Sequence, residues 1–161
     1  MDVVTLGDSL LRKRSVLVND IDQGIRDFIG AMFDTIHEGE GIGLAAVQVG
    51  HLHRFFVTHL PDDIPRVFIN PEIIETSLQQ GKFEEGCLSI PGVTAEVTRS
   101  VSVQMQAWNE KGRPFTMRAE GLLARVMQHE LDHLNGKLFI DHLSSKKRER
   151  LVKEYDNKVR V

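Results

Sequence analysis

The sequence predicts an α+β fold in which antiparallel or mixed β-sheets pack around a helix in the C-terminal part of the chain. A helical pattern comes first, over residues 20–38, with apolar residues at spacings of three and four. Strand-like segments separated by Pro, Gly, Asp and Asn follow it, and helical patterns return after residue 120. Because strands and helices do not alternate regularly, the pattern does not favour a parallel sheet.

The composition indicates one soluble globular domain over residues 1–161. The chain is 41% hydrophobic and 27% charged, with a net charge of -3, and this near-neutral balance argues against DNA binding. No charge-free stretch approaches the ~18 residues that span a bilayer, and the N-terminus lacks the pattern of a secretory signal. The single cysteine, Cys87, is typical of a reducing compartment. We therefore expect a cytoplasmic protein with no membrane partner.

Three helices are predicted. The first is amphipathic, and its apolar residues are Ile21, Ile25, Phe28, Ile29, Met32, Phe33 and Ile36. The second covers residues 121–134 and ends at Asn135-Gly136, a pair suited to a helix C-terminus. The third, residues 145–161, is rich in Lys and Arg. We expect this basic helix to present a solvated face, with a ribosome or nucleic-acid contact as the alternative.

The predicted strands lie between the first two helices and should pair mostly antiparallel. They cover residues 53–60, 66–75, 93–108 and 114–120. Residues 85–92, Glu-Gly-Cys-Leu-Ser-Ile-Pro-Gly, are predicted to form an extended loop because Gly and Pro interrupt them.

The sharpest local motif is His-Glu-Leu-Asp-His at residues 129–133. Two histidines four residues apart project from one helix face and can share a metal ion. On a helical projection His129 and His133 lie beside the apolar arc, and Glu130 falls in the same buried sector. The opposite side, predicted to face solvent, carries Arg125, Gln128, Asp132 and Asn135. The alternative is a purely structural role, with two histidines in the core and Glu130 in a buried ion pair.

Cys87 is a candidate third ligand. One thiolate and two imidazoles would leave a tetrahedral metal ion with an open fourth position, as catalytic sites have. If His142 were a fourth ligand, the site would instead be structural. Taken alone, Cys87 is more often a small buried hydrophobe. The remaining histidines show no ligand spacing with this set and are interpreted as surface or structural residues: His37, His51, His53 and His59.

Residues 41–48, Gly-Ile-Gly-Leu-Ala-Ala-Val-Gln, form a third unusual segment. Its small residues let another chain approach the backbone closely, although such a run most often reflects tight internal packing. It lacks the Gly-Lys-Ser/Thr of a Walker loop and the third glycine of a dinucleotide fingerprint, so it does not indicate phosphate binding.

Taken in order, these three segments resemble the peptide deformylase family. That family is marked by a GφGφAAxQ loop, an EGCLS loop and a QHExDHL helix, which stand here as GIGLAAVQ, EGCLS and QHELDHL. The flanking segments GDSLLRKRS, FINPEI and GKLFIDHLS are also similar, so the resemblance covers nearly the whole chain. Gly7 stands where many members have proline.

The resemblance implies a peptide deformylase-like fold and removal of the formyl group from N-formylmethionyl nascent peptides. Cys87, His129 and His133 would hold Fe²⁺, for which Zn²⁺, Ni²⁺ or Co²⁺ can substitute. Glu130 would take the proton of the attacking water and deliver it to the departing amine. Gln48, through its side-chain amide, and Leu88, through its backbone N–H, would stabilise the oxyanion.

The substrate would bind as an added strand, with its methionine side chain in an apolar pocket. The residues expected to contact it are Gly41, Ile42, Gly43, Phe83, Glu85, Gly86, Leu122 and Val126. Arg125 stands where some members have an aliphatic residue, and its stem could cover this pocket. Glu40 and Arg99 are a candidate ion pair between the two loops, and Glu85 is a candidate acceptor for a ligand histidine. We expect a monomer.

Two other functions stay open. An HExxH metallopeptidase would normally take its third ligand from a downstream helix, whereas here the thiol lies upstream. A ribosome- or RNA-binding domain would hold a structural zinc with Cys87, His129, His133 and His142, and its affinity would fall steeply with salt.

Overall fold

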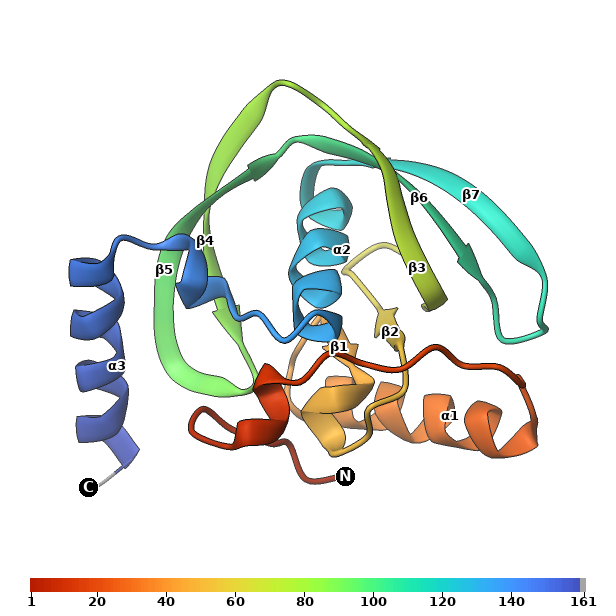
Figure 1. The fold of residues 1–161 in the computed structure, drawn as a ribbon, viewed down its shortest axis with the longest axis horizontal. Coiled ribbons are helices and arrows are strands. Elements are labelled where there is room, and N and C mark those ends of the chain that lie inside the picture. Colours follow the sequence, from red (N-terminus) through yellow and green to blue (C-terminus); the bar gives the residue numbers. More distant parts are fainter. Residues whose placement is uncertain (160–161) are drawn as a thin grey trace.

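The computed structural model describes residues 1–159 and confirms the α+β class (Figure 1). Its helices are α1 (Gln23–Glu38), α2 (Gly121–Leu134) and α3 (Ser145–Val159), with 3₁₀ turns η1 (Ser9–Arg12), η2 (Ala46–Val49) and η3 (Phe139–His142). Its strands are β1 (Gly43–Ala45), β2 (Phe55–Thr58), β3 (Arg66–Thr76), β4 (Gln80–Cys87), β5 (Ile90–Ser100), β6 (Ser102–Trp108) and β7 (Pro114–Glu120). Residues 160–161 of the predicted basic helix lie outside the described residues.

Two sheets make up the β structure. A five-stranded sheet has the order β1-β2-β3-β6-β7, and β4 pairs with β5 in a separate two-stranded sheet. Every pair of neighbouring strands is antiparallel, as predicted. Helix α2 stands in the middle of the molecule, between the β4–β5 ribbon on one side and the larger sheet on the other (Figure 1). The central helix is therefore in contact with both sheets.

The strand predictions need two corrections. Residues 93–108 were predicted as one strand-like segment, but the chain passes from one sheet to the other at Val101, between β5 and β6. Most of the predicted extended loop is strand, because β4 ends at Cys87 and β5 begins at Ile90. Strand β4 carries two glycines and little apolar alternation, because one of its faces meets solvent and the other meets charged groups. Its sequence therefore lacks the period-two signal of a half-buried strand.

Helix α2 packs against the two sheets through two different faces. One face packs small and flexible side chains, Ala124 and Met127, against Phe56, Phe68 and Met105 of the larger sheet. These residues are almost fully buried, so the face removes a large apolar area from water. The opposite face turns toward β4 and β5, and it carries the histidines and Arg125.

The prediction that Arg125 faces solvent is wrong. Its side chain is only 4% exposed, and it donates to the backbone carbonyls of Gly81 and Val97. Gln128 likewise bonds to the carbonyl of Ser100 and is half-buried, as are the two other residues of that face, Asp132 and Asn135. A helical projection shows which side of a helix is polar, but not that a second sheet covers that side.

Among residues 1–159, no helix is long and apolar enough to cross a membrane.

Candidate metal centre and substrate cleft

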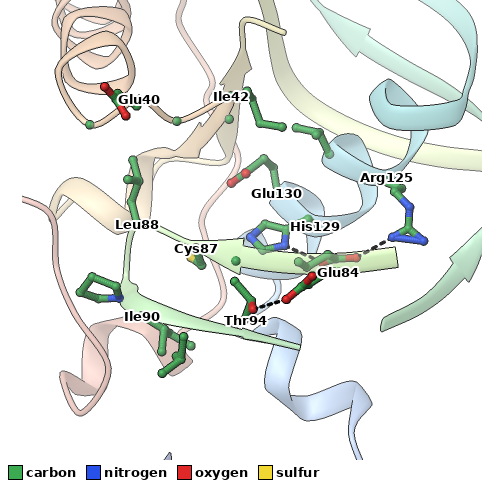
Figure 2. Close-up of a pocket in the computed structure, with 18 of the residues that line it drawn as sticks. Glu40, Ile42, Glu84, Cys87, Leu88, Ile90, Thr94, Arg125, His129 and Glu130 are labelled. Carbon is green, nitrogen blue, oxygen red and sulfur yellow. Dashed lines mark hydrogen bonds and ion pairs between the residues drawn. The ribbon is translucent and has the colours of Figure 1, made fainter. Parts of the chain in front are cut away.

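A cavity of about 570 Å³ opens between β1, β4 and α2 (Figure 2). One wall is the chain from Gly39 to Gly43, and the facing wall is the β4–β5 ribbon from Phe83 to Thr94. Helix α2 closes the floor. The three motifs that stand far apart in the sequence therefore meet at one hollow.

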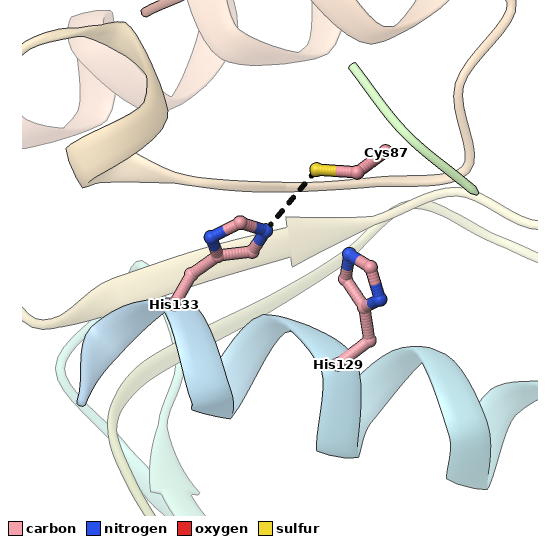
Figure 3. A group of neighbouring side chains, drawn as sticks. All are labelled: Cys87, His129 and His133. Atoms are coloured by element: carbon pink, nitrogen blue, oxygen red, sulfur yellow. Dashed lines mark hydrogen bonds between the residues drawn. The ribbon is translucent and has the colours of Figure 1, made fainter. Parts of the chain in front are cut away.

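Cys87, His129 and His133 lie close together (Figure 3), and Cys87 and His129 line the hollow. Each offers one ligand atom, and these three atoms lie within 4.8 Å of one another. The Sγ of Cys87 is 3.3 Å from Nε2 of His133. The i, i+4 spacing on α2 places both imidazoles on one face, as the sequence predicts. No other such group of three is found among residues 1–159.

The chemistry of this group suits a divalent transition metal. Burial raises the pKa of the Cys87 thiol, but the imidazoles of His133 and His129 outweigh it and hold that pKa well below its usual range. The thiolate is the form that binds metals. Two imidazoles and a thiolate are ligands that Fe²⁺, Zn²⁺, Ni²⁺ and Co²⁺ accept. The residues present therefore fit a metal ion with three protein ligands.

Glu130 lies beside this group and is almost fully buried. Burial raises the pKa of its carboxyl group, against the opposing effect of both histidines. Its Oε1 atom has no hydrogen-bond partner among the described residues. A buried acceptor without a partner is costly, so its position calls for a polar group in the cavity. Such a carboxylate is well placed to exchange a proton with a molecule bound there.

Gln48 is held in a single orientation. Its Oε1 accepts a hydrogen bond from the backbone N–H of Ala45, at 2.9 Å. Its Nε2 therefore turns toward the centre and donates to Ser89 Oγ, at 3.1 Å, and to Cys87 Sγ, at 3.3 Å. Leu88, between these two residues, lines the cavity. The sequence reasoning missed Ser89, although it stands in the same EGCLS motif.

Glu85 anchors a buried charge network. Its Oε1 accepts a hydrogen bond from Nδ1 of His129 at 2.8 Å, which leaves Nε2 of that ring for a metal. Arg99 donates to both oxygens of Glu85, at 2.6 and 3.0 Å, and Arg125 donates at 3.1 Å. Burial raises the pKa of Glu85, but the bonds from His129 and Arg99 prevail and lower it to about 2. Glu85 is therefore a carboxylate that orients His129, one of the candidate ligands.

The predicted ion pair between Glu40 and Arg99 is wrong. Arg99 is buried and pairs with Glu85 and, at 3.0 Å, with Asp132, whereas Glu40 is an exposed residue of the cavity rim. His142 bonds to the same Asp132 carboxylate at 2.7 Å. It is therefore not part of the group of candidate ligands, and the prediction of a fourth ligand has no support.

The residues predicted to contact a substrate all line the cavity. They are Gly41, Ile42, Gly43, Phe83, Glu85, Gly86, Leu122 and Val126. Strands β1 and β4 each stand at the edge of their sheet, on the two sides of the hollow. Backbone edges of this kind can accept an added strand.

Fold and site together define a metallohydrolase: a three-ligand metal group, a buried carboxylate beside it, and an open cavity. Residues 1–149 match the family model of polypeptide deformylase. The chain therefore belongs to the polypeptide deformylase family, whose members are metal-dependent hydrolases that remove formyl groups.

Known relatives agree with this membership. The chain is 43% identical to the peptide deformylase of Brucella suis over 157 residues, covering 95% of this chain and 90% of the relative. It is 50% identical to that of Clostridium botulinum over 140 residues, covering 87% of this chain and 94% of the relative. The crystal structure of peptide deformylase from Ehrlichia chaffeensis superimposes with a TM-score of 0.94 at 36% identity, covering 98% of this chain and 96% of that one.

Proposed function

We propose that this chain removes the formyl group from the N-terminal formylmethionine of newly made polypeptides by hydrolysis, releasing formate. The observation that carries the proposal is the buried Glu130 carboxylate, with its unpartnered oxygen, beside Cys87, His129 and His133 in an open cavity. A purely structural metal site would need no such carboxylate and no open cavity.

Metal binding and proton transfer would be carried out by different residues of the site. When bound by Cys87, His129 and His133, a divalent metal ion lowers the pKa of water toward neutrality and polarises a carbonyl group. Glu130 would accept the proton of the attacking water and then give it to the departing amine. The water oxygen would form a new C–O bond to the formyl carbon, and the C–N bond of the formamide would then break, so the products are formate and a free N-terminus.

The developing oxyanion would be stabilised by two donors. The amide of Gln48 is fixed by its bond to Ala45, so it costs little reorganisation when charge appears. The backbone N–H of Leu88 is the second candidate, from the segment that follows Cys87. Both roles rest on the family resemblance together with the position of these residues at the cavity.

The peptide would add as a strand between β1 and β4. Since Cys87 ends β4, a chain that begins with its formyl group at the metal would run back along β4 toward Phe83. Alternate side chains of a strand point to opposite faces, so the first side chain would enter the hollow. There Ile42, Leu122 and Val126 offer apolar walls.

The finer assignments belong to the same proposal. The family resemblance favours Fe²⁺ as the native metal, and the same two imidazoles and thiolate would also accept Zn²⁺, Ni²⁺ or Co²⁺. Residues 1–161 would form one monomeric domain in the cytoplasm. Helix α3, Ser145–Val159, presents exposed Lys146, Lys147, Arg148 and Arg150, charges that suit a contact with the ribosome.

Formate release tests the proposal. Anaerobically purified protein is given formyl-Met-Ala-Ser or acetyl-Met-Ala-Ser, beside a Glu130→Gln variant whose metal content is measured in parallel. We expect turnover of the formyl peptide alone, and a variant that keeps its metal but loses at least about a hundredfold in kcat. A metal-loaded wild type that releases no formate would refute the proposal.

A further inference from the structure

Arg125 occupies a place that the reaction described above does not explain. It lies in the wall of the cavity, and its guanidinium group points toward β4, where it donates to Glu85 (Figure 2). An arginine that is only 4% exposed must be held by several partners, because a buried charge is costly.

Three acceptors hold this guanidinium group in one plane. Its NH1 donates to Oε2 of Glu85 at 3.1 Å, and its NH2 donates to the carbonyls of Gly81 at 3.1 Å and Val97 at 3.4 Å. These partners come from both strands of the β4–β5 ribbon. Arg125 is therefore a rigid platform that joins α2 to the ribbon.

The ring of Phe83 lies flat on this platform. The guanidinium carbon is 3.4 Å from the ring centroid, well inside the range of cation–π contacts. Phe83 is 46% exposed, so the protein core does not fix its ring. A Cβ atom built on Gly81 would lie 3.4 Å from Cε2 of the ring, so the ring also lies close to a residue that has no side chain. The position of the ring therefore depends on Arg125.

We propose that Arg125 is a positioning residue that holds Phe83 as the outer wall of the pocket for the substrate's first side chain, and so limits the size of that side chain. The inference rests on the proposed function, because that function brings the side chain of formylmethionine into this hollow. With the ring fixed, a slender unbranched side chain fits, whereas a bulky aromatic one needs the ring to move. Without Arg125 the ring can turn outward, and the pocket accepts larger groups.

A double-mutant cycle tests this inference. The proteins are the wild type, Arg125→Met, Phe83→Ala and the double variant, assayed for kcat/KM with formyl-Met-Ala-Ser and formyl-Phe-Ala-Ser. Arg125→Met should lower the preference for the methionine peptide about 5- to 30-fold, the range expected for loss of a partly buried cation–π contact. In the Phe83→Ala background the same change should alter the preference less than about twofold.

Arg125→Lys is the conservative control, because it keeps a positive charge near Glu85 but loses the flat guanidinium surface. It should lose preference as Arg125→Met does while retaining the wild-type metal content. An effect of Arg125→Met that slows both peptides equally, or that persists in the Phe83→Ala background, would show that Arg125 acts through Glu85 and His129 instead. Either result would overturn the inference.

Binding of the reaction products separates this inference from the proposed function. Met-Ala-Ser and Phe-Ala-Ser are titrated calorimetrically into the same metal-loaded proteins, which reports on the pocket without turnover. The same non-additive loss of preference supports the inference even if no formate is released, whereas equal affinities of the wild type for both peptides overturn it. Absence of formate release by the wild type refutes only the proposed function.

Discussion

Gly43 lies so close to Glu130 that the methyl group added by Gly43→Ala tests the position of the Glu130 carboxylate. A Cβ atom built on Gly43 would lie 2.7 Å from Oε2 of Glu130 and 2.8 Å from Cγ1 of Val126. Ordinary van der Waals contacts of this kind begin near 3.4 Å, so in Gly43→Ala the carboxylate must retreat by about 0.7 Å. Misplacing a catalytic group by ~1 Å can cost about a hundredfold in rate. We therefore expect kcat to fall about 10- to 100-fold.

The assay is steady-state formate release, with metal content and melting temperature measured on the same samples. The metal content of Gly43→Ala should match the wild type, because the three atoms nearest to the new methyl group belong to Glu130 and Val126 and not to a candidate ligand. Gly30→Ala is the matched control. A Cβ at Gly30 meets nothing within 4 Å on an exposed helix position, so this variant should keep full activity and gain about 0.4–1 kcal/mol of stability. If Gly43→Ala keeps the wild-type kcat, Glu130 does not act from the position described here.

Two further predictions concern Gln48 and Glu85. Gln48→Ala removes one oxyanion donor and should lower kcat about 10²- to 10³-fold at unchanged metal content; a rise in KM alone, seen in steady-state kinetics, would argue against that role. The pKa of Glu85 is lowered to about 2 in the folded protein, from 4.5 for the unperturbed carboxyl group. The charged form of Glu85 therefore stabilises the fold above pH 4.5, and this stabilisation is lost as the pH falls from about 4.5 to about 2. Glu85→Gln should therefore be less stable than the wild type by about 3 kcal/mol at pH 7 and by much less at pH 2–3, as urea unfolding would show; a difference independent of pH would contradict the assignment.

The proximity of Cys87, His129 and His133 could be predicted from the sequence because its signals are local. His129 and His133 are spaced by one helical turn, which fixes their common face whatever surrounds the helix. Cys87 entered the prediction as the only thiol of the chain, in a segment of unusual composition. The identity of the ligands thus depends on short-range geometry and on a family resemblance that covers the same residues.

The bond between Glu85 and a histidine of the motif was predicted, and His129 makes it, but the arginine partners of Glu85 could not be predicted in the same way. The partners of Arg99 come from β4 and α2, which lie 14 and 33 residues away in the chain. Nothing local to Arg99 distinguishes these partners from Glu40, the residue chosen from the sequence. Arg125 was wrongly predicted to face solvent for a related reason. A helical projection uses only the polarity of residues on the same helix. The residues that cover Arg125 belong to the β4–β5 ribbon, and strand β4 was not predicted from the sequence.

The two unpaired strand edges that face each other across the cleft also bear on how copies of this chain avoid one another. An exposed edge is a template for any extended segment, including the same edge of a second molecule. Here β1 offers only three residues, and β4 carries an irregularity in its pairing between Glu85 and Cys87 and an acidic pair, Glu84 and Glu85. A long, flat strand from a neighbouring molecule could form few backbone hydrogen bonds with these edges, whereas a short flexible chain end can bind in the cleft between β1 and β4. Strand edges of this kind favour a short chain end over a long strand of a second molecule.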